Sequence, residues 1–114
     1  MTSEAIGQRS PDYREITPDW FFGGTKTELI EVTFLTAKPN AFEQFINKKE
    51  VMDHTEEVTL KLTPQTSKSL AIWIIQNVKA YENQHGKIKN VELENDDPQR
   101  QQIAILVEEL LAKV

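Results

Sequence analysis

The polar segment around His54 is the part of this sequence whose residue types most resemble a site for chemistry. Asp53 and His54 are adjacent, and Glu56 and Glu57 follow them closely. An imidazole beside carboxylates is a combination used by general bases and by metal sites. Neighbouring side chains rarely converge on one point, however, and an unsupported loop holds a site poorly. We therefore interpret this segment as a solvated loop and expect neither a catalytic residue nor a metal ligand in it.

The other candidates for chemistry have simpler structural interpretations. His85 precedes Gly86 at the predicted end of a helix, where a protonated imidazole would interact favourably with the helix dipole. Gly23 and Gly24 lack the lysine and the spacing of a phosphate-binding loop and are typical of a turn. The sequence has no cysteine, which excludes disulfides, thiolate metal sites and cysteine nucleophiles. We predict no catalytic residue, no metal ion and no cofactor.

The charge balance makes nucleic acid an unlikely partner. The chain has 18 acidic and 13 basic residues, for a formal net charge of −5. A negative balance repels phosphate backbones and anionic lipids unless the bases gather on one face. The aromatic residues Trp20, Phe21 and Phe22 could stack on bases, but Asp19 adjoins them and Lys26 is the nearest base downstream. Packing in a core or an interface is the interpretation that we favour.

Length and hydropathy indicate one small domain. A chain of 114 residues buries a thin core, and we divide it into a flexible lead (residues 1–12) and a single α+β domain (residues 13–114). Residues 93–114 form a C-terminal helical extension of that domain. The longest apolar run, residues 70–75, is far too short to cross a bilayer. Residues 1–10 do not resemble a secretory signal, so we expect a cytoplasmic protein without membrane contact.

The first half of the chain predicts an antiparallel sheet. Residues 27–36 alternate in polarity, with Ile30, Val32 and Phe34 on the apolar face, and residues 57–62 alternate in the same way. The aromatic segment of residues 19–22, closed by the two glycines, adds a further strand. The predicted architecture is an antiparallel sheet of about three to four strands with a long helix on one face and an additional C-terminal helix.

Three helices are predicted. Asn40 is a plausible N-cap for a short helix whose two phenylalanines, Phe42 and Phe45, should lie over the sheet. Thr63 and Pro64 begin a long helix that ends near His85, with Gly86 in the left-handed conformation after it. Residues 87–93 form a short strand or an extended link, and a C-terminal helix begins near Pro98.

Three stretches carry a resemblance to a known family. They are Pro11-Asp12-Tyr13-Arg14-Glu15-Ile16, Leu62-Thr63-Pro64 and the helix end Tyr81-Glu82-Asn83-Gln84-His85-Gly86-Lys87-Ile88. Together they resemble a family of small prokaryotic proteins known only as a domain of unknown function. Its hallmark is a strand, a Ser/Thr-Pro helix start and a closing Tyr-Glu followed by Gly-x-Ile. The resemblance spans roughly residues 11–91, and it implies a fold and no activity.

The most informative departure from a simple amphipathic pattern is Ile72-Trp73. These residues lie outside the core face of the long helix, and Ile105 and Leu106 extend the apolar stripe of the C-terminal helix on both flanks. Helices that are apolar over most of their circumference usually lie between two layers. Either the C-terminal helix or another chain should therefore cover Ile72 and Trp73. The predicted interface consists of Ile72, Trp73, Ile105, Leu106 and Leu110.

These observations predict a non-enzymatic protein-protein interaction module that self-associates as a homodimer, because self-association adds buried area to a thin core. The alternative is a nucleic-acid-binding accessory protein. It requires one surface to gather the lysines Lys48, Lys49, Lys61, Lys68, Lys79, Lys87 and Lys89. A small hydrolase or transferase that uses His54 in a pocket is the third hypothesis.

Overall fold

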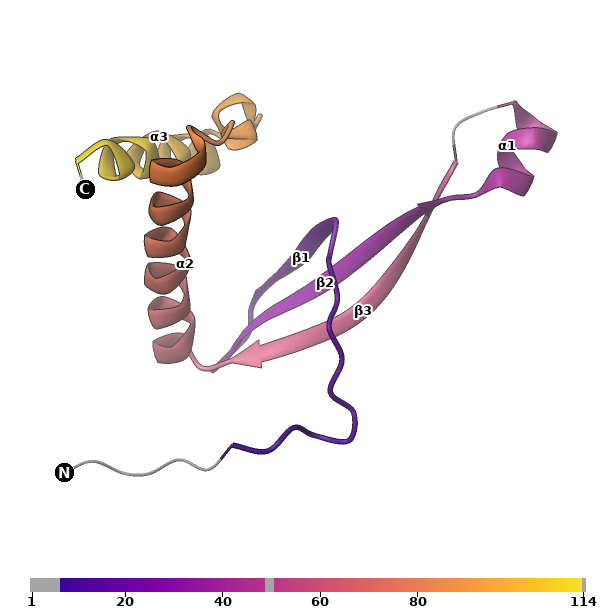
Figure 1. Ribbon diagram of the computed structural model, residues 1–114, viewed down its shortest axis with the longest axis horizontal. Coiled ribbons are helices and arrows are strands. Elements are labelled where there is room, and N and C mark those ends of the chain that lie inside the picture. The colour runs from indigo at the N-terminus through magenta and orange to yellow at the C-terminus, as the bar shows by residue number, and fades with distance from the viewer. Residues whose placement is uncertain (1–6, 49–50, 114) are drawn as a thin grey trace. The chain divides into compact units, whose positions relative to one another are not determined.

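The computed structural model describes residues 7–48 and 51–113 (Figure 1). It divides into two compact units, Met1–Leu62 and Thr63–Val114, here named the strand unit and the helical unit. The elements in chain order are β1 (Trp20–Thr25), β2 (Ile30–Pro39), α1 (Ala41–Asn47), β3 (Met52–Leu62), α2 (Pro64–His85), the 3-10 helix η1 (Val91–Glu94) and α3 (Pro98–Lys113). The three-stranded antiparallel sheet, the long helix and the C-terminal helix confirm the predicted α+β class.

The predicted lead of residues 1–12 falls partly inside the described chain. Residues 1–6 lie outside it, and residues 7–12 are exposed and form neither helix nor strand. Tyr13 closes a turn by donating its backbone N–H to the Ser10 carbonyl oxygen at 2.9 Å. None of the helices in the described ranges is long and apolar enough to cross a membrane.

The strand unit is built on the sheet order β1-β2-β3, with both neighbouring pairs antiparallel. The strand predicted over this segment is confirmed, and Phe34 of β2 lies opposite Phe21 on β1 and opposite Val58 on β3. The predicted difference in burial between the two faces of β2 is not observed, because residues of both faces are half-buried. Directly opposed residues share a face, so this face is apolar on all three strands. On the other face Thr33, the buried polar residue of the sheet, hydrogen-bonds Thr59 through their hydroxyl oxygens at 2.7 Å.

The glycines of β1 correct one prediction. Gly23 and Gly24 were expected to form a turn, but they lie inside β1, opposite Val32 and Glu31. The turn comes later, where Lys26 donates its N–H to the Leu29 carbonyl oxygen at 2.8 Å. Glycine is needed inside the strand because the backbone of β2 approaches too closely at Gly23 for a side chain to fit.

A β-bulge interrupts the pairing of β2 with β3 between Phe34 and Leu35 and leaves Glu57 as the extra residue. The polar groups of Glu57 find other partners. Thr36 donates its hydroxyl to the carboxylate at 2.9 Å, and Arg14 forms an ion pair with it at 3.1 Å. Arg14 also donates to the Glu57 backbone carbonyl oxygen. The bulge therefore holds the segment that precedes β1 against the sheet.

Helix α1 lies at the end of the β2–β3 hairpin (Figure 1). The predicted N-cap is confirmed, since Asn40 Oδ1 accepts the Glu43 N–H at 3.0 Å. The phenylalanines, however, do not pack over the sheet: Phe42 is 69% exposed and Phe45 is 84% exposed. The reason is that β2 runs on to residue 39 and β3 begins at residue 52, so the strands carry α1 beyond the apolar part of the sheet.

The helical unit begins as predicted. Thr63 Oγ1 accepts the Thr66 N–H at 3.2 Å, and Pro64 occupies the first turn of α2. The helix ends at His85, and Gly86 follows it with a φ of 95° and a ψ of 172°, which lies outside the left-handed helical conformation that was predicted for it. Gly86 still closes the helix by donating its N–H to the Glu82 carbonyl oxygen at 2.9 Å. These local signals confirm both ends of the long helix.

The return from α2 to α3 contains no strand within the described residues. Lys87–Asn90 is irregular, and η1 then begins with Asn90 as its cap. Arg100 and Glu92 form an ion pair at 2.7 Å that joins α3 to η1. The buried hydrophobic residues in the described part of the unit are Ala104 and Leu111. They are seven residues apart and therefore lie on the same face of α3.

Candidate functional site

The segment around His54 lies in β3, which corrects the predicted loop. His54 is opposite Ala37, and Asp53 is opposite Lys38, so their side chains point to opposite faces of the sheet. Asp53 accepts a hydrogen bond from Asn40 Nδ2 at 3.1 Å. The strand was missed because residues 53–57 are polar on both faces and give no alternation. Across residues 7–48 and 51–113, no cluster of three or more histidine, aspartate or glutamate residues could hold a metal ion.

His85 lies in the last turn of α2, as predicted. Its ring packs against Tyr81, with ring centroids 4.5 Å apart and planes tilted by 38°. This spacing of four residues places the two rings on the same side of the helix. The contact is local, and His85 is exposed.

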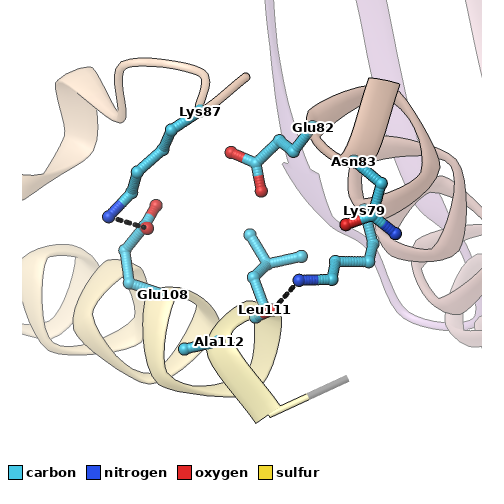
Figure 2. A pocket seen from close by; sticks show the side chains of 7 residues that line it. All are labelled: Lys79, Glu82, Asn83, Lys87, Glu108, Leu111 and Ala112. Atoms are coloured by element: carbon cyan, nitrogen blue, oxygen red, sulfur yellow. Dashed lines mark hydrogen bonds and ion pairs between the residues drawn. The ribbon is translucent and has the colours of Figure 1, made fainter. Parts of the chain in front are cut away.

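A cleft of ≈ 280 Å³ lies where the C-terminal ends of α2 and α3 meet (Figure 2). Its lining consists of Lys79, Glu82, Asn83, Lys87, Glu108, Leu111 and Ala112. Lys79 Nζ donates to the Leu111 carbonyl oxygen at 2.6 Å. The lysine ammonium therefore stabilises the C-terminal end of α3, where backbone carbonyl groups lack helical partners. Lys87 and Glu108 form an ion pair at 3.4 Å.

The charged groups of this cleft are thus engaged within the helical unit. Glu82 Oε2 accepts the Ile88 N–H at 2.9 Å, which ties the end of α2 to the segment after it. The ion pair of Lys87 with Glu108 and the hydrogen bond from Lys79 to the Leu111 carbonyl oxygen hold α3 against the C-terminal end of α2. Sequence reasoning missed the cleft because its ion pair joins residues that are distant in the chain.

The predicted interface residues fall on separate flanks of the helical unit. Ile72 and Leu110 line one apolar groove of ≈ 260 Å³ together with Ile75 and Leu111. Ile72 is 54% exposed, so α3 leaves it open rather than covering it. The structure therefore brings Ile72 and Leu110 together, as an interface would require.

Trp73 lies on a different flank of α2. It lines a hollow of ≈ 310 Å³ with Ile74, Tyr81 and Ile88, and it is 59% exposed. The C-terminal helix and another chain were the two predicted covers for Trp73, and α3 does not cover it within the helical unit. The remaining predicted residues, Ile105 and Leu106, are 40% and 52% exposed on α3.

The charges of α2 are confined to one side. Its lysines and acidic residues are Lys68, Lys79 and Glu82, and successive residues at 100° place all three within an arc of about 60°. Lys79 and Glu82 also line the cleft shared with α3. The remainder of the α2 circumference contains no lysine, arginine, aspartate or glutamate. A helix of this kind is typical of a position between layers.

The lysines of the nucleic-acid hypothesis are divided between the two units. In the helical unit, Lys79 and Lys87 are engaged by the Leu111 carbonyl oxygen and by Glu108. In the strand unit, Lys61 lies 4.0 Å from Glu31 across the sheet. Lys49 lies outside the described residues.

No protein-family model matches the chain, and no curated protein and no solved structure matches it. The family resemblance therefore stays a prediction.

Proposed function

We propose that this protein is a non-enzymatic interaction module that self-associates through the apolar surface of its helical unit. One observation supports the proposal most strongly. In the described part of the helical unit, Ala104 and Leu111 are the buried hydrophobic side chains, whereas the large hydrophobic side chains at its surface are exposed by 37% to 59%. Such surface is rare on a protein that acts alone, and it is typical of an interaction site.

Burial of this surface would stabilise the protein substantially. Fully burying a large apolar side chain stabilises a protein by roughly 1.5–3 kcal/mol. Trp73 and Ile72 are both more than half exposed, so each would contribute a large part of that amount on burial. A second copy is the partner that we propose, because most soluble oligomers are symmetric assemblies of one chain.

The flanks of α2 give the proposal its geometry. The groove with Ile72 and the hollow with Trp73 lie on different sides of the helix. A single flat surface covers one side of a helix, so one flank of α2 stays open after one such surface has packed against it. That open flank is available to a second chain.

The test is the molar mass of the protein in solution, with Trp73→Ala as the variant. Loss of the Trp73 side chain should lower the dimer fraction at a fixed concentration. Trp20→Ala is the matched control, because Trp20 is the other tryptophan, is 52% exposed and belongs to the strand unit. Equal dimer fractions in wild type and Trp73→Ala would contradict the proposal.

A further inference from the structure

The stripe formed by Leu70, Ile74, Asn77 and Tyr81 has the spacing of a helix-pairing seam. Its members are four, three and four residues apart, which keeps them on one side of α2. Ile74 is 46% exposed and Tyr81 is 53% exposed, and Trp73 lies beside them. We infer that this stripe pairs with the same stripe of a second copy, with the two-fold axis passing beside Asn77. The inference rests on the proposed self-association and specifies the surface of α2 through which the two copies pair.

The absence of acidic and basic side chains favours this side of α2 as the surface for self-pairing. An arc of about 140° around Asn77 contains no aspartate, glutamate, lysine or arginine. Its members are Thr66, Ser67, Leu70, Trp73, Ile74, Asn77, Ala80, Tyr81, Gln84 and His85. Two copies with a formal net charge of −5 each repel one another, and the repulsion is smallest where the facing surfaces are uncharged. A strongly charged partner would instead be matched by a charged face.

Asn77 fixes where the axis lies. It is a polar residue within an apolar stripe, and its Nδ2 donates to the Trp73 carbonyl oxygen of the same helix at 2.9 Å. An amide buried in a seam needs a partner for its remaining donor and acceptor, because an unsatisfied buried group costs about 1–3 kcal/mol. A second Asn77 supplies both groups. In a symmetric dimer a residue meets its own copy only at the two-fold axis.

The area of the seam predicts a reversible dimer. Aromatic side chains bury about 150–250 Å² each, so the exposed parts of Trp73 and Tyr81 amount to roughly 200 Å² per chain. With the aliphatic positions of the stripe, the pair buries on the order of 1,000 Å², which is the low end for a specific interface. The dimer fraction should therefore change with protein concentration.

Single cysteines test the seam directly, because the full chain contains none. Asn77→Cys places a thiol at the proposed axis, and Gln76→Cys places one on the next residue, which lines the groove with Ile72. Each full-length variant is oxidised at a concentration where the wild type is dimeric, and the covalent dimer is measured on a non-reducing gel. Circular dichroism checks that both variants keep their helix content.

The seam predicts a yield of covalent dimer about tenfold higher for Asn77→Cys than for Gln76→Cys, because a disulfide requires Cα atoms within roughly 7 Å. A dimeric wild type with preferential cross-linking at Gln76→Cys, or at neither position, overturns the seam and leaves the proposed self-association standing. A wild type that is monomeric at every concentration overturns both. As a second measurement, Asn77→Lys should weaken dimerisation by placing like charges at the axis, and Gln76→Lys should not.

Discussion

Replacing Gly23 by alanine tests the pairing of β1 with β2. Gly23 has a φ of 154°, and a Cβ added to it would lie 2.1 Å from the Glu31 carbonyl oxygen and 2.9 Å from the Glu31 carbonyl carbon. Both contacts are shorter than real Cβ contacts, and both atoms belong to the main chain. No side-chain rotation can relieve the clash, so the backbone of β1 must move.

The magnitude follows from two contributions. A side chain in an unfavourable backbone conformation with positive φ costs roughly 1–2 kcal/mol. Moving β1 away from β2 weakens one or two hydrogen bonds of the ladder, at about 1 kcal/mol each. The free energy of unfolding of the Gly23→Ala variant should therefore fall by roughly 2–4 kcal/mol, a large share of the ~5–15 kcal/mol that holds a typical domain together.

The assay is chemical denaturation followed by the fluorescence of the aromatic residues. Gly24→Ala is the matched control, because no heavy atom lies within 4 Å of its added Cβ. That variant should change the free energy of unfolding by less than about 1 kcal/mol, and alanine's smaller loss of backbone entropy favours a gain. Equal destabilisation by the two substitutions would refute the close approach of the two strands at Gly23.

Two further variants test contacts of the helical unit. Thr63→Ala removes the hydroxyl oxygen that accepts the first-turn N–H of α2, and the free energy of unfolding should fall by about 0.5–2 kcal/mol, whereas Thr63→Ser should retain most of it. Lys79→Met keeps the aliphatic chain but removes the ammonium bound to the Leu111 carbonyl oxygen, which should cost about 1 kcal/mol. Lys68→Met, at an exposed position of the same helix, should stay within about 0.5 kcal/mol of the wild type by the same denaturation assay, and equal losses for the two lysines would contradict the contact.

The ends of the helices could be predicted from the sequence because their signals are local. The Thr63 hydroxyl, the following proline and Gly86 act within one turn of the residues that they cap. Asn40 caps α1 in the same way. The strand β2 was also predictable, because its apolar and polar residues alternate with the period of two of a β-strand.

The rest depended on contacts that the sequence does not encode locally. Residues 53–57 of β3 are polar on both faces, so no period of two distinguishes them from a loop. The role of Gly23 is set by the carbonyl of Glu31, a residue of the neighbouring strand. Sequence reasoning predicted that Ile72 and Trp73 lie outside the core face, but only the packing of α3 separates them into two flanks.

The most direct test of the central proposal is the molar mass of the wild-type protein, measured by size exclusion with light scattering at several concentrations. The monomer mass is 13.1 kDa. Self-association through the helical unit predicts a mass that rises with concentration toward twice that value. A mass that stays at the monomer value across the whole range would contradict the proposal.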